Sequence, residues 1–289
     1  MKVAILGKFL KSEPSHYITK LVSLLKKRKV SIFLEEEYYS QLKELLPENI
    51  NSFTELDKSY DLLISIGGDG TILKAITFVK HLSIPIVGIN SGRLGFLAKI
   101  KIDKIEEAID EIISGNYSIS ERSLIEVVTS EKNNELSKLN FALNEIAVSR
   151  KNTTSMISIE TKLDDKYLNS YWADGLIIAT PTGSTGYSLS CGGPIIMPGT
   201  NNIIITPNAP HNLNVRPIVI GDNSVIKLKV EDRDQLAMVS LDSRSRAFDS
   251  DTELTIQKAK FKTKLIQPQN NSFTSTIRNK LMWGLDKRS

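Results

Sequence analysis

Three glycines surround one aspartate in the segment SIGGDGT, residues 65 to 71, directly after an apolar run. A glycine-rich turn that leads into a helix presents backbone N–H groups to a phosphate. The residues that would form this turn and the helix start are Gly67, Gly68, Gly70 and Thr71. A carboxylate would repel a phosphate that it touched, so phosphate binding alone does not explain Asp69 in this turn. An ordinary tight turn would explain the same letters about equally well.

A second segment, ADGLIIATPTGSTGYSLSCGGPI at 173 to 195, packs two loops of small residues around one apolar run. Its hydroxyls and exposed amides are suited to hydrogen-bonding a sugar and a phosphate, and Tyr187 offers a stacking face. A flexible Gly/Ser linker is the simpler explanation of this composition. The rigid Pro181 and Pro194 argue against that explanation.

Asn144 and Glu145 stand side by side where an apolar strand pattern starts. Adjacent strand residues point to opposite faces, so both side chains reach one ligand only if the backbone is irregular or ends there. Ordinary surface exposure would also explain this pair.

Several familiar site patterns are missing from the sequence. It has no G-x-x-x-x-G-K-[ST] segment and no G-x-G-x-x-G segment, so a phosphate would have to be bound by another device. Ser184 is a weak candidate for a nucleophile, because the elbow G-x-S-x-G would need glycine where Thr182 stands. A single cysteine and three unpaired histidines do not predict a structural metal site, whereas a Mg²⁺ brought in by phosphates needs only one or two carboxylates.

The elements that must position these residues change in character along the chain. Up to residue 119, short apolar runs alternate with helical patterns, which predicts an α/β domain with a Rossmann-like parallel sheet. In such sheets, ligands bind in loops at the carboxyl ends of the strands. Residues 120–271 read as strand after strand, which predicts an all-β, sandwich-like second domain.

A last helical pattern follows within residues 272–289, with Phe273, Ile277, Leu281 and Met282 as its apolar positions. A lone helix cannot bury such a stripe, so we expect this C-terminal helix to return to the first domain.

Composition indicates a globular protein with an anionic small ligand. The chain carries 37 Lys and Arg against 33 Asp and Glu, a mild excess that is spread along the sequence. This distribution favours a small anion over nucleic acid. The single Cys191 precludes an internal disulfide, and no apolar stretch is long enough for a membrane span, so we expect a cytoplasmic protein with no membrane partner.

In order along the chain, these motifs resemble those of the NAD kinase family. The matching segments are GGDGT at 67 to 71, NSGRLGFLA at 90 to 98, NE at 144 and 145, ADGLIIATPTGSTGYSLSCGGP at 173 to 194, and ITPNAPHNLNVRPIV at 205 to 219. The first is shared with lipid kinases, whereas the long Thr/Gly/Ser segment discriminates the family. The resemblance implies transfer of the γ-phosphoryl group of ATP to the 2′-hydroxyl of the adenosine ribose of NAD, with a divalent metal such as Mg²⁺.

The resemblance also implies roles for individual residues. Asp69 would accept the proton of that hydroxyl, and the glycine loop with Thr71 would face the phosphate donor. The second domain would bind NAD and supply contacts for a homodimer or homotetramer. The NAD-binding residues would be Asp69, Gly70, Lys74, Phe96, Asn144, Glu145, Asp174, Thr185, Gly186, Tyr187, Ser188, Leu189 and Ser190.

The sequence departs from the family pattern at two places. Gly186 stands where members often have alanine, which we expect to enlarge the pocket slightly. The segment LDSRSR stands closest to a family Asp-Gly-Gln, and no role is transferred to it. Two alternatives stay open: a lipid or diacylglycerol-type kinase with the same glycine loop, and a non-catalytic sensor of NAD or NADP, which would not require Asp69.

Overall fold

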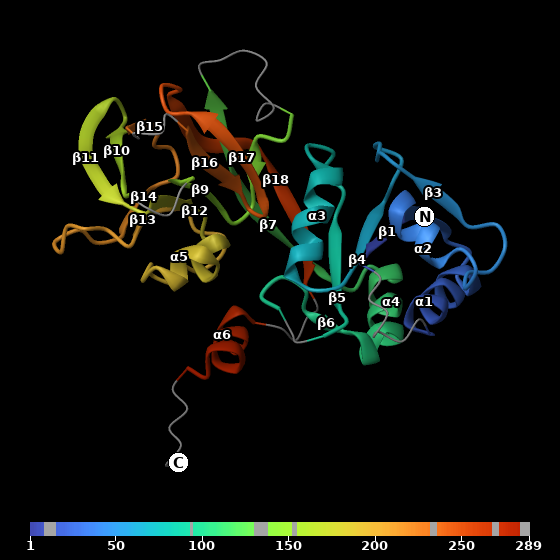
Figure 1. Cartoon of the computed structure of the whole chain (residues 1–289). Coiled ribbons are helices and arrows are strands. Elements are labelled where there is room, and N and C mark those ends of the chain that lie inside the picture. The colour runs from blue at the N-terminus through green and yellow to red at the C-terminus, as the bar shows by residue number, and fades with distance from the viewer. Residues whose placement is uncertain are drawn as a thin grey trace. The chain divides into compact units, whose positions relative to one another are not determined.

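Five parallel strands are the main strands of the sheet in the first part of the chain, and the short β6 (Ile100–Lys101) pairs with β5 beside them (Figure 1). The five main strands are β1 (Lys2–Gly7), β2 (Ser31–Glu35), β3 (Asn51–Phe53), β4 (Leu62–Ile66) and β5 (Ile86–Asn90), in the spatial order β3-β2-β1-β4-β5. Every residue of β4 and β5 is buried. A parallel sheet covered on both faces requires such fully buried, largely apolar strands, and this confirms the predicted Rossmann-like sheet.

The structure is a computed structural model that describes residues 1–8, 16–92, 95–129, 138–151, 155–231, 236–267 and 272–283. Arg93 and Leu94 of the motif NSGRLGFLA lie outside the described residues, as does the end of the predicted C-terminal segment. Among the residues described, no helix has both the length and the apolar character needed to span a membrane.

The chain divides into two compact units, residues 1–121 with 263–289 and residues 122–262. The sequence pattern predicts that the second domain ends at residue 271, whereas the second unit ends at residue 262. The reason is that the strand β18 (Leu254–Gln267) continues beyond the second unit, and its Leu265 pairs in parallel with Ile86 of β5.

Helices cover the sheet of the first unit. They are α1 (His16–Lys27), α2 (Glu36–Leu42), α3 (Asp69–Val79) and α4 (Ile105–Ile113). Apolar residues of α1 and α4 form one buried cluster with alternate residues of β1, such as Val3 and Ile5. α3 packs on β4 and β5, and Gly88 of β5 lets the Ile72 side chain approach the strand closely.

The strand order fixes where loops gather. β1 leads to β2 on one side, whereas the chain returns after β3 to place β4 on the other side of β1. The carboxyl ends of β1 and β4 are in register, with Gly7 opposite Ile66. Ligands of open parallel sheets bind outside such a switch point. The short loop after β4 is Gly67 and Gly68, and α3 begins directly after it at Asp69.

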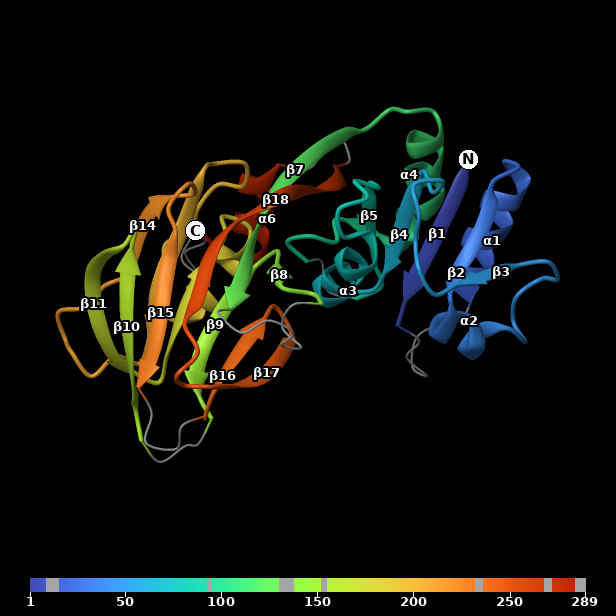
Figure 2. The same cartoon turned by 90° about the horizontal axis from the view of Figure 1, so that it is seen from above.

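Two mostly antiparallel sheets form the second unit. The first has the order β14-β13-β12-β9-β16-β17, and the second contains β11, β10, β15 and β18, with β7 and β8 attached. Figure 2 shows β10, β11 and β15 side by side. The strands of these two sheets that have not yet been given bounds are β7 Ser118–Thr129, β8 Phe141–Ala142, β9 Glu145–Arg150, β10 Ile157–Leu163, β11 Lys166–Ala173, β12 Gly175–Ala179, β13 Asn202–Asn208, β14 Ile218–Gly221, β15 Ile226–Glu231, β16 Leu236–Leu241 and β17 Arg244–Asp249.

One apolar core joins the two sheets of this unit. It contains Val148 and Ile178 from the first sheet and Ile159, Leu228 and Ile256 from the second. A core between the inner faces of two sheets is that of a β-sandwich, so the predicted sandwich-like fold is confirmed.

Short elements complete the fold. They are β6 (Ile100–Lys101), the 3₁₀ turns Ile102–Lys104 and Gly183–Thr185, α5 (Tyr187–Ser190) and α6 (Phe273–Leu281). The helix α6 belongs to the first unit, and its Lys280 ammonium lies 5.1 Å from the centre of the Phe96 ring. The predicted apolar stripe is wrong at Met282, which is 71% exposed and ends the helix in a left-handed conformation.

Candidate active site

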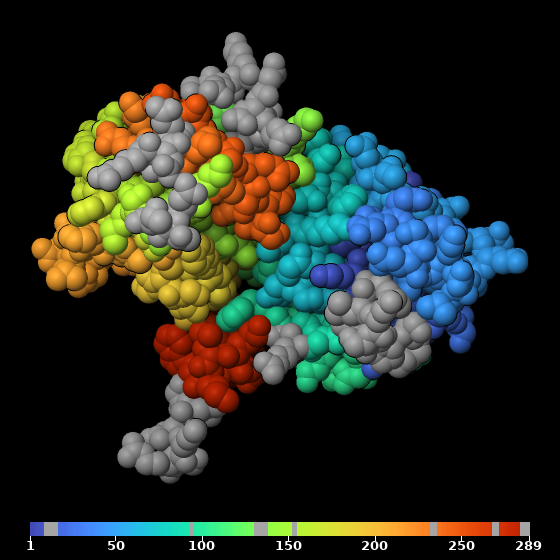
Figure 3. Space-filling view, in the orientation of Figure 1, coloured from blue at the N-terminus to red at the C-terminus, as the bar shows by residue number. Residues whose placement is uncertain are grey.

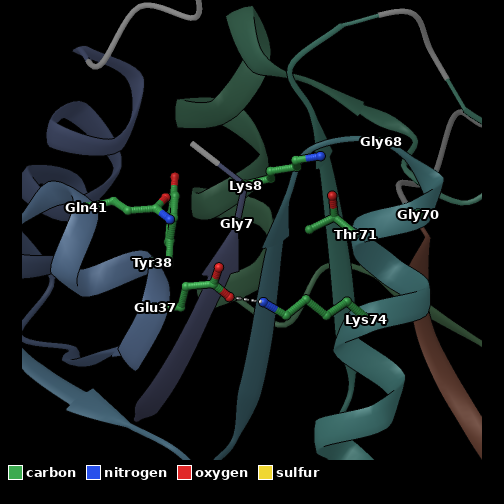
Figure 4. Close-up of a pocket in the computed structure, with 9 residues that line it drawn as sticks. All are labelled: Gly7, Lys8, Glu37, Tyr38, Gln41, Gly68, Gly70, Thr71 and Lys74. Carbon is green, nitrogen blue, oxygen red and sulfur yellow. Dashed lines mark hydrogen bonds and ion pairs between the residues drawn. The ribbon is translucent and has the colours of Figure 1, made fainter. Parts of the chain in front are cut away.

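A cavity of about 570 Å³ opens in the first unit at the carboxyl ends of β1 and β4 (Figure 4). In the space-filling view of Figure 3, the dark blue end of β1 lies between the blue surface of α2 and the teal surface of α3. The lining residues are Gly7, Lys8, Glu37, Tyr38, Gln41, Gly68, Gly70, Thr71 and Lys74. The cavity therefore lies at the switch point of the parallel sheet.

The glycine loop supplies one wall of this cavity. Gly67 has φ +144°, and a Cβ there would lie 2.3 Å from Thr71 Oγ1, so this position requires glycine. A Cβ on Gly68 or Gly70 would meet no described heavy atom within 4 Å. These two residues leave the backbone at the start of α3 bare toward the cavity, and a helix N-terminus attracts phosphate.

Two lysines and a glutamate add charge to the cavity. Lys8 extends from the end of β1 toward the start of α3 (Figure 4). Lys74 Nζ lies 3.0 Å from Glu37 Oε2 and 3.5 Å from Glu35 Oε1. Partial burial disfavours the charged ammonium, but the bond to Glu37 and the two carboxylate charges outweigh it and raise the pKa of Lys74. Lys74 therefore stays charged in the cavity that the glycine loop lines.

Asp69 is the first residue of α3, yet its carboxylate is bound on the side of the loop that follows β5. Oδ2 accepts the Phe96 N–H at 2.7 Å, and Oδ1 accepts the N–H groups of Leu97 and Ala98 at 3.0 Å each. Gly68, Gly70 and Thr71 line the cavity, whereas the neighbouring Asp69 side chain is fixed by these three amides. Among the described residues, Oδ2 accepts only the Phe96 N–H, and because a carboxylate oxygen can accept two hydrogen bonds it has capacity for one more donor.

Gly95 makes this arrangement sterically feasible. A Cβ on Gly95 would lie 1.8 Å from Asp69 Oδ1, far inside van der Waals contact. The backbone at residue 95 and the carboxylate can approach each other only because no side chain intervenes.

The cavity fits a Mg²⁺ that arrives with phosphates better than one held by the protein alone. Glu37 contributes a carboxylate to the lining, and Mg²⁺ bound with substrate phosphates needs only one or two such ligands. Within the described ranges, no three or more His, Cys, Asp or Glu side chains cluster as metal ligands. When bound, the metal would neutralise phosphate charge.

In the second unit, the segment 180 to 187 packs against Asn144 and Glu145. The backbone N–H of Thr180 donates to the Asn144 carbonyl at 2.9 Å, and the Thr180 hydroxyl donates to the Leu143 carbonyl at 2.5 Å. A Cβ on Gly183 would lie 2.0 Å from the Asn144 carbonyl oxygen. Two motifs that lie far apart in the sequence thus pack directly against each other. Asn144 lies just before β9, where the backbone is irregular.

Glu145, the first residue of β9, has an unusual carboxyl group. Burial and the negative charge of Asp242 raise its pKa to about 7, against the opposing effect of the Tyr187 backbone N–H. Among the described residues, Glu145 Oε2 has no hydrogen-bond partner. This oxygen is buried although the residue as a whole is half-buried, and a buried polar atom without a partner calls for a donor such as a ligand group.

Gly186 does not enlarge the pocket as expected. A Cβ at residue 186 would lie 2.8 Å from Glu145 Oε2 and 3.2 Å from the Gly183 carbonyl oxygen. The space of an alanine methyl group is therefore already taken by the Glu145 carboxyl.

The hydroxyl-rich loop divides into inward and outward residues. Ser188 is fully buried and its hydroxyl shares a 2.8 Å hydrogen bond with Thr206, so its side chain serves the fold. Ser184 is also fully buried, and its hydroxyl donates to the Pro181 carbonyl at 2.7 Å, which leaves no exposed nucleophile there. The outward-facing positions include the half-buried Thr185 and Leu189 and the exposed Ser190.

Tyr187 and Asp174 offer side chains at the surface of this unit. Tyr187 is 42% exposed, and its hydroxyl accepts a 2.8 Å hydrogen bond from the Asn208 side chain. Asp174 is half-buried and pairs with Arg150 at 3.1 Å. The Tyr187 ring is thus held in a fixed place while part of it remains accessible.

Comparison with known proteins identifies the family. The ATP-NAD kinase N-terminal domain matches residues 3–117, and the ATP-NAD kinase C-terminal domain matches residues 143–268. The chain belongs to the NAD kinase family. An NAD kinase from Christiangramia forsetii is 50% identical and one from Bacteroides fragilis is 45% identical, and each alignment covers 100% of both chains.

Solved structures of the NAD kinase family share the fold. An NAD kinase from Archaeoglobus fulgidus in complex with ATP is 26% identical with a TM-score of 0.75, and the match covers 98% of each chain. A yeast NADH kinase complexed with NADH has a TM-score of 0.88 at 23% identity, over 99% of this chain and 88% of that one.

Sequence reasoning missed part of the cavity lining and the residues that support it. Lys8, Glu37, Tyr38 and Gln41 carry no motif, although Lys8 follows β1 as the glycine loop follows β4, and the shared edge could have indicated it. Gly95 belongs to the motif NSGRLGFLA, but the sequence alone indicated no role for it. The structure brings together Asn144, Glu145, Gly186 and Tyr187 as one group in the second unit.

Proposed function

We propose that this member of the NAD kinase family transfers the γ-phosphoryl group of ATP to the 2′-hydroxyl of the adenosine ribose of NAD, which yields NADP and ADP. The observation that carries the proposal is the Asp69 carboxylate. Three main-chain amides hold it next to a phosphate-binding loop, and Oδ2 can accept one more hydrogen bond. An alcohol acceptor requires such a group.

The donor side of the reaction fits the cavity of the first unit. Phosphoryl transfer needs alignment and charge neutralisation more than covalent chemistry. Gly67, Gly68, Gly70 and Thr71 would face the phosphates with backbone N–H groups, and Lys8 and Lys74 supply positive charge. A Mg²⁺ carried by ATP would offset the remaining phosphate charge.

The acceptor side depends on Asp69 and the second unit. The attacking hydroxyl donates its hydrogen bond to Asp69, its oxygen bonds to the γ-phosphorus, and its proton passes to the carboxylate as the bond to ADP breaks. Asn144 and Glu145 would hold the adenosine portion. The remaining NAD contacts would come from Gly70, Lys74, Phe96, Asp174 and the accessible part of residues 185 to 190, with the Tyr187 ring against a base.

A steady-state assay tests the proposal. The purified chain is offered NAD or NADH as acceptor, ATP or polyphosphate as donor, and Mg²⁺ or EDTA, and NADP(H) formation is measured with a coupled dehydrogenase. We expect NADP from NAD and ATP, and loss of turnover in EDTA. A parallel reaction with diacylglycerol and labelled ATP tests the lipid kinase alternative, which activity on the lipid alone would establish.

A non-catalytic sensor of NAD is the other alternative. A sensor would need the adenosine-holding residues but not a carboxylate beside the phosphate loop. The presence of Asp69 therefore disfavours the sensor hypothesis. Calorimetry that showed tight NAD binding with no turnover under any donor and metal would establish the sensor.

We also propose that the protein is a cytoplasmic homodimer or homotetramer. Large apolar side chains are exposed on the second unit, among them Trp172 at 53% and Leu213 at 85%. Exposed apolar groups of this size are common at subunit contacts. Light scattering after gel filtration would measure the mass of the assembly, and a monomer at micromolar concentration would contradict the proposal.

A further inference from the structure

A tight turn between β16 and β17 forms hydrogen bonds with the segment that leads into β9. Asp242 in this turn has φ +53°, and its side chain is only 5% exposed. Its Oδ2 accepts the N–H of Leu143 at 3.0 Å, and its Oδ1 accepts those of Asn144 at 2.7 Å and Glu145 at 3.3 Å. Its own N–H donates to the Glu145 carbonyl at 3.0 Å.

Arg244, two residues further, holds the preceding part of the same segment. Its guanidinium donates to the Leu139 carbonyl at 2.7 Å and also to the Phe141 carbonyl. The same guanidinium lies 5.4 Å from the centre of the Phe141 ring and 4.0 Å from Asp242 Oδ2. The acidic residue therefore binds N–H groups and the basic residue binds carbonyl groups along one stretch, 139 to 145.

The stretch is held from a second direction by Thr180, through the Asn144 and Leu143 carbonyls. With the main chain of Asn144 fixed on both sides, its position cannot follow a ligand. The side chains of Asn144 and Glu145 are then presented from a rigid support.

Stability alone explains this device poorly. Burying a carboxylate carries a desolvation cost, and the three amide hydrogen bonds and the guanidinium compensate for that cost without adding net stability. Apolar side chains at this place would stabilise the fold equally well. What the buried charge provides is a defined backbone geometry at one place. That place is the pair of residues assigned to the adenosine of NAD.

We propose that Asp242 and Arg244 are positioning residues that set the geometry of Asn144 and Glu145 for NAD. The inference rests on the proposed function, because it takes NAD as the ligand of that pair. Positioning residues differ from general stabilisers in one measurable respect. Their loss weakens binding of one substrate selectively, and only while the residues they position are present.

The test compares Asp242→Asn and Arg244→Lys with two matched controls in the same hairpin. The asparagine keeps the size of Asp242 but directs an amide N–H₂ at the main-chain donors. The lysine keeps the charge of Arg244 but loses its fork. Ser243→Ala and Arg246→Lys are the controls, because both side chains are exposed. Calorimetry gives the Kd of NAD, and steady-state kinetics gives the KM of ATP and kcat.

We expect the Kd of NAD to rise roughly tenfold in Asp242→Asn and several-fold in Arg244→Lys, with the KM of ATP within twofold of wild type. The controls should stay within twofold on both measures. In a background that carries both Asn144→Ala and Glu145→Ala, the effect of Asp242→Asn should shrink to less than about threefold. Hydrogen exchange of the amides at 143 to 145 should accelerate in Asp242→Asn.

The outcomes separate the two levels of the argument. If wild type neither binds nor phosphorylates NAD, the proposed function fails and the inference fails with it. If Asn144→Ala weakens NAD binding but Asp242→Asn and Arg244→Lys do not, only the inference is overturned. An equal loss for NAD and ATP, or an undiminished effect in the background without the Asn144 and Glu145 side chains, also overturns it. Should Asp242→Asn not fold, Arg244→Lys provides the same comparison.

Discussion

Asp69 in the first unit and Asp242 in the second use the same hydrogen-bonding device. Each carboxylate accepts three N–H groups from three consecutive residues, 96 to 98 and 143 to 145. They differ in accessibility, because Asp69 is half-buried whereas the Asp242 side chain is 5% exposed. Burial raises the pKa of Asp242, against the opposing effect of the three amides and Arg244.

The difference shows that the same three hydrogen bonds can either present a carboxylate or fix a main-chain segment. At Asp69, the amides hold a carboxylate that we assign to the chemistry, so the carboxylate is what the arrangement presents. At Asp242, the buried carboxylate holds a segment, so the arrangement presents Asn144 and Glu145. Substitutions should therefore affect turnover in the first case and substrate affinity in the second.

The strongest challenge to this comparison is Asp69→Asn. The amide cannot accept the proton of the ribose hydroxyl, so we expect kcat to fall roughly 10²- to 10⁴-fold while the Kd of NAD stays within a few-fold. Rapid-quench or coupled assays give kcat, and calorimetry gives the Kd. Near-normal NADP formation by this variant would remove Asp69 from the chemistry.

A milder challenge is Gly95→Ala. The added methyl would lie 1.8 Å from Asp69 Oδ1 and must displace the carboxylate. Misplacement of a catalytic group by about 1 Å can cost about 10²-fold, so we expect kcat to fall roughly 10- to 100-fold.

Gly92→Ala is the matched control for Gly95→Ala, because a Cβ at residue 92 meets no described heavy atom within 4 Å. Circular dichroism would verify that both variants fold. Equal activities of the two alanine variants would show that the position of Asp69 is not critical.

The smallest expected effect concerns stability at Glu145. Below pH 4.5 this carboxyl is protonated in the folded and unfolded chains alike, and between 4.5 and about 7 only the unfolded chain loses the proton. The group therefore lowers the free energy of unfolding as pH rises, and the loss is complete above about pH 7. Glu145→Gln should gain roughly 1 to 3 kcal/mol over wild type at pH 8 and little at pH 4.

Urea unfolding of wild type and Glu145→Gln at the two pH values measures that difference. A gain of the same size at both pH values would show that the carboxyl is not held with a raised pKa. It would also weaken the contrast between an accessible Asp69 and a buried acidic pair in the second unit.

Local sequence patterns were sufficient for the frame of the molecule. Largely apolar runs such as LLISI at 62 to 66 favour burial on both faces, and this predicts a parallel sheet with loops at one edge. The glycine segment after that strand was therefore assigned to the correct edge from the sequence.

Long-range contacts set the limit of such reasoning. Nothing near Asp69 in the sequence indicates that its carboxylate is bound 27 to 29 residues later. The hydroxyl-rich loop shows the same limit, because the letters do not tell that Ser188 bonds Thr206 on a neighbouring strand while Ser190 faces solvent. Composition identified the loop, and only tertiary packing assigned its individual side chains.

The glycines described above separate two kinds of selection. Gly67 and Gly183 have no room for a Cβ, so a library screened only for soluble, folded protein should already exclude other residues there. Gly68 and Gly70 have room, so the same screen should accept alanine at both, and only a screen for NADP formation would reject it. We therefore expect folding to require glycine at residues 67 and 183, and substrate binding to require it at residues 68 and 70.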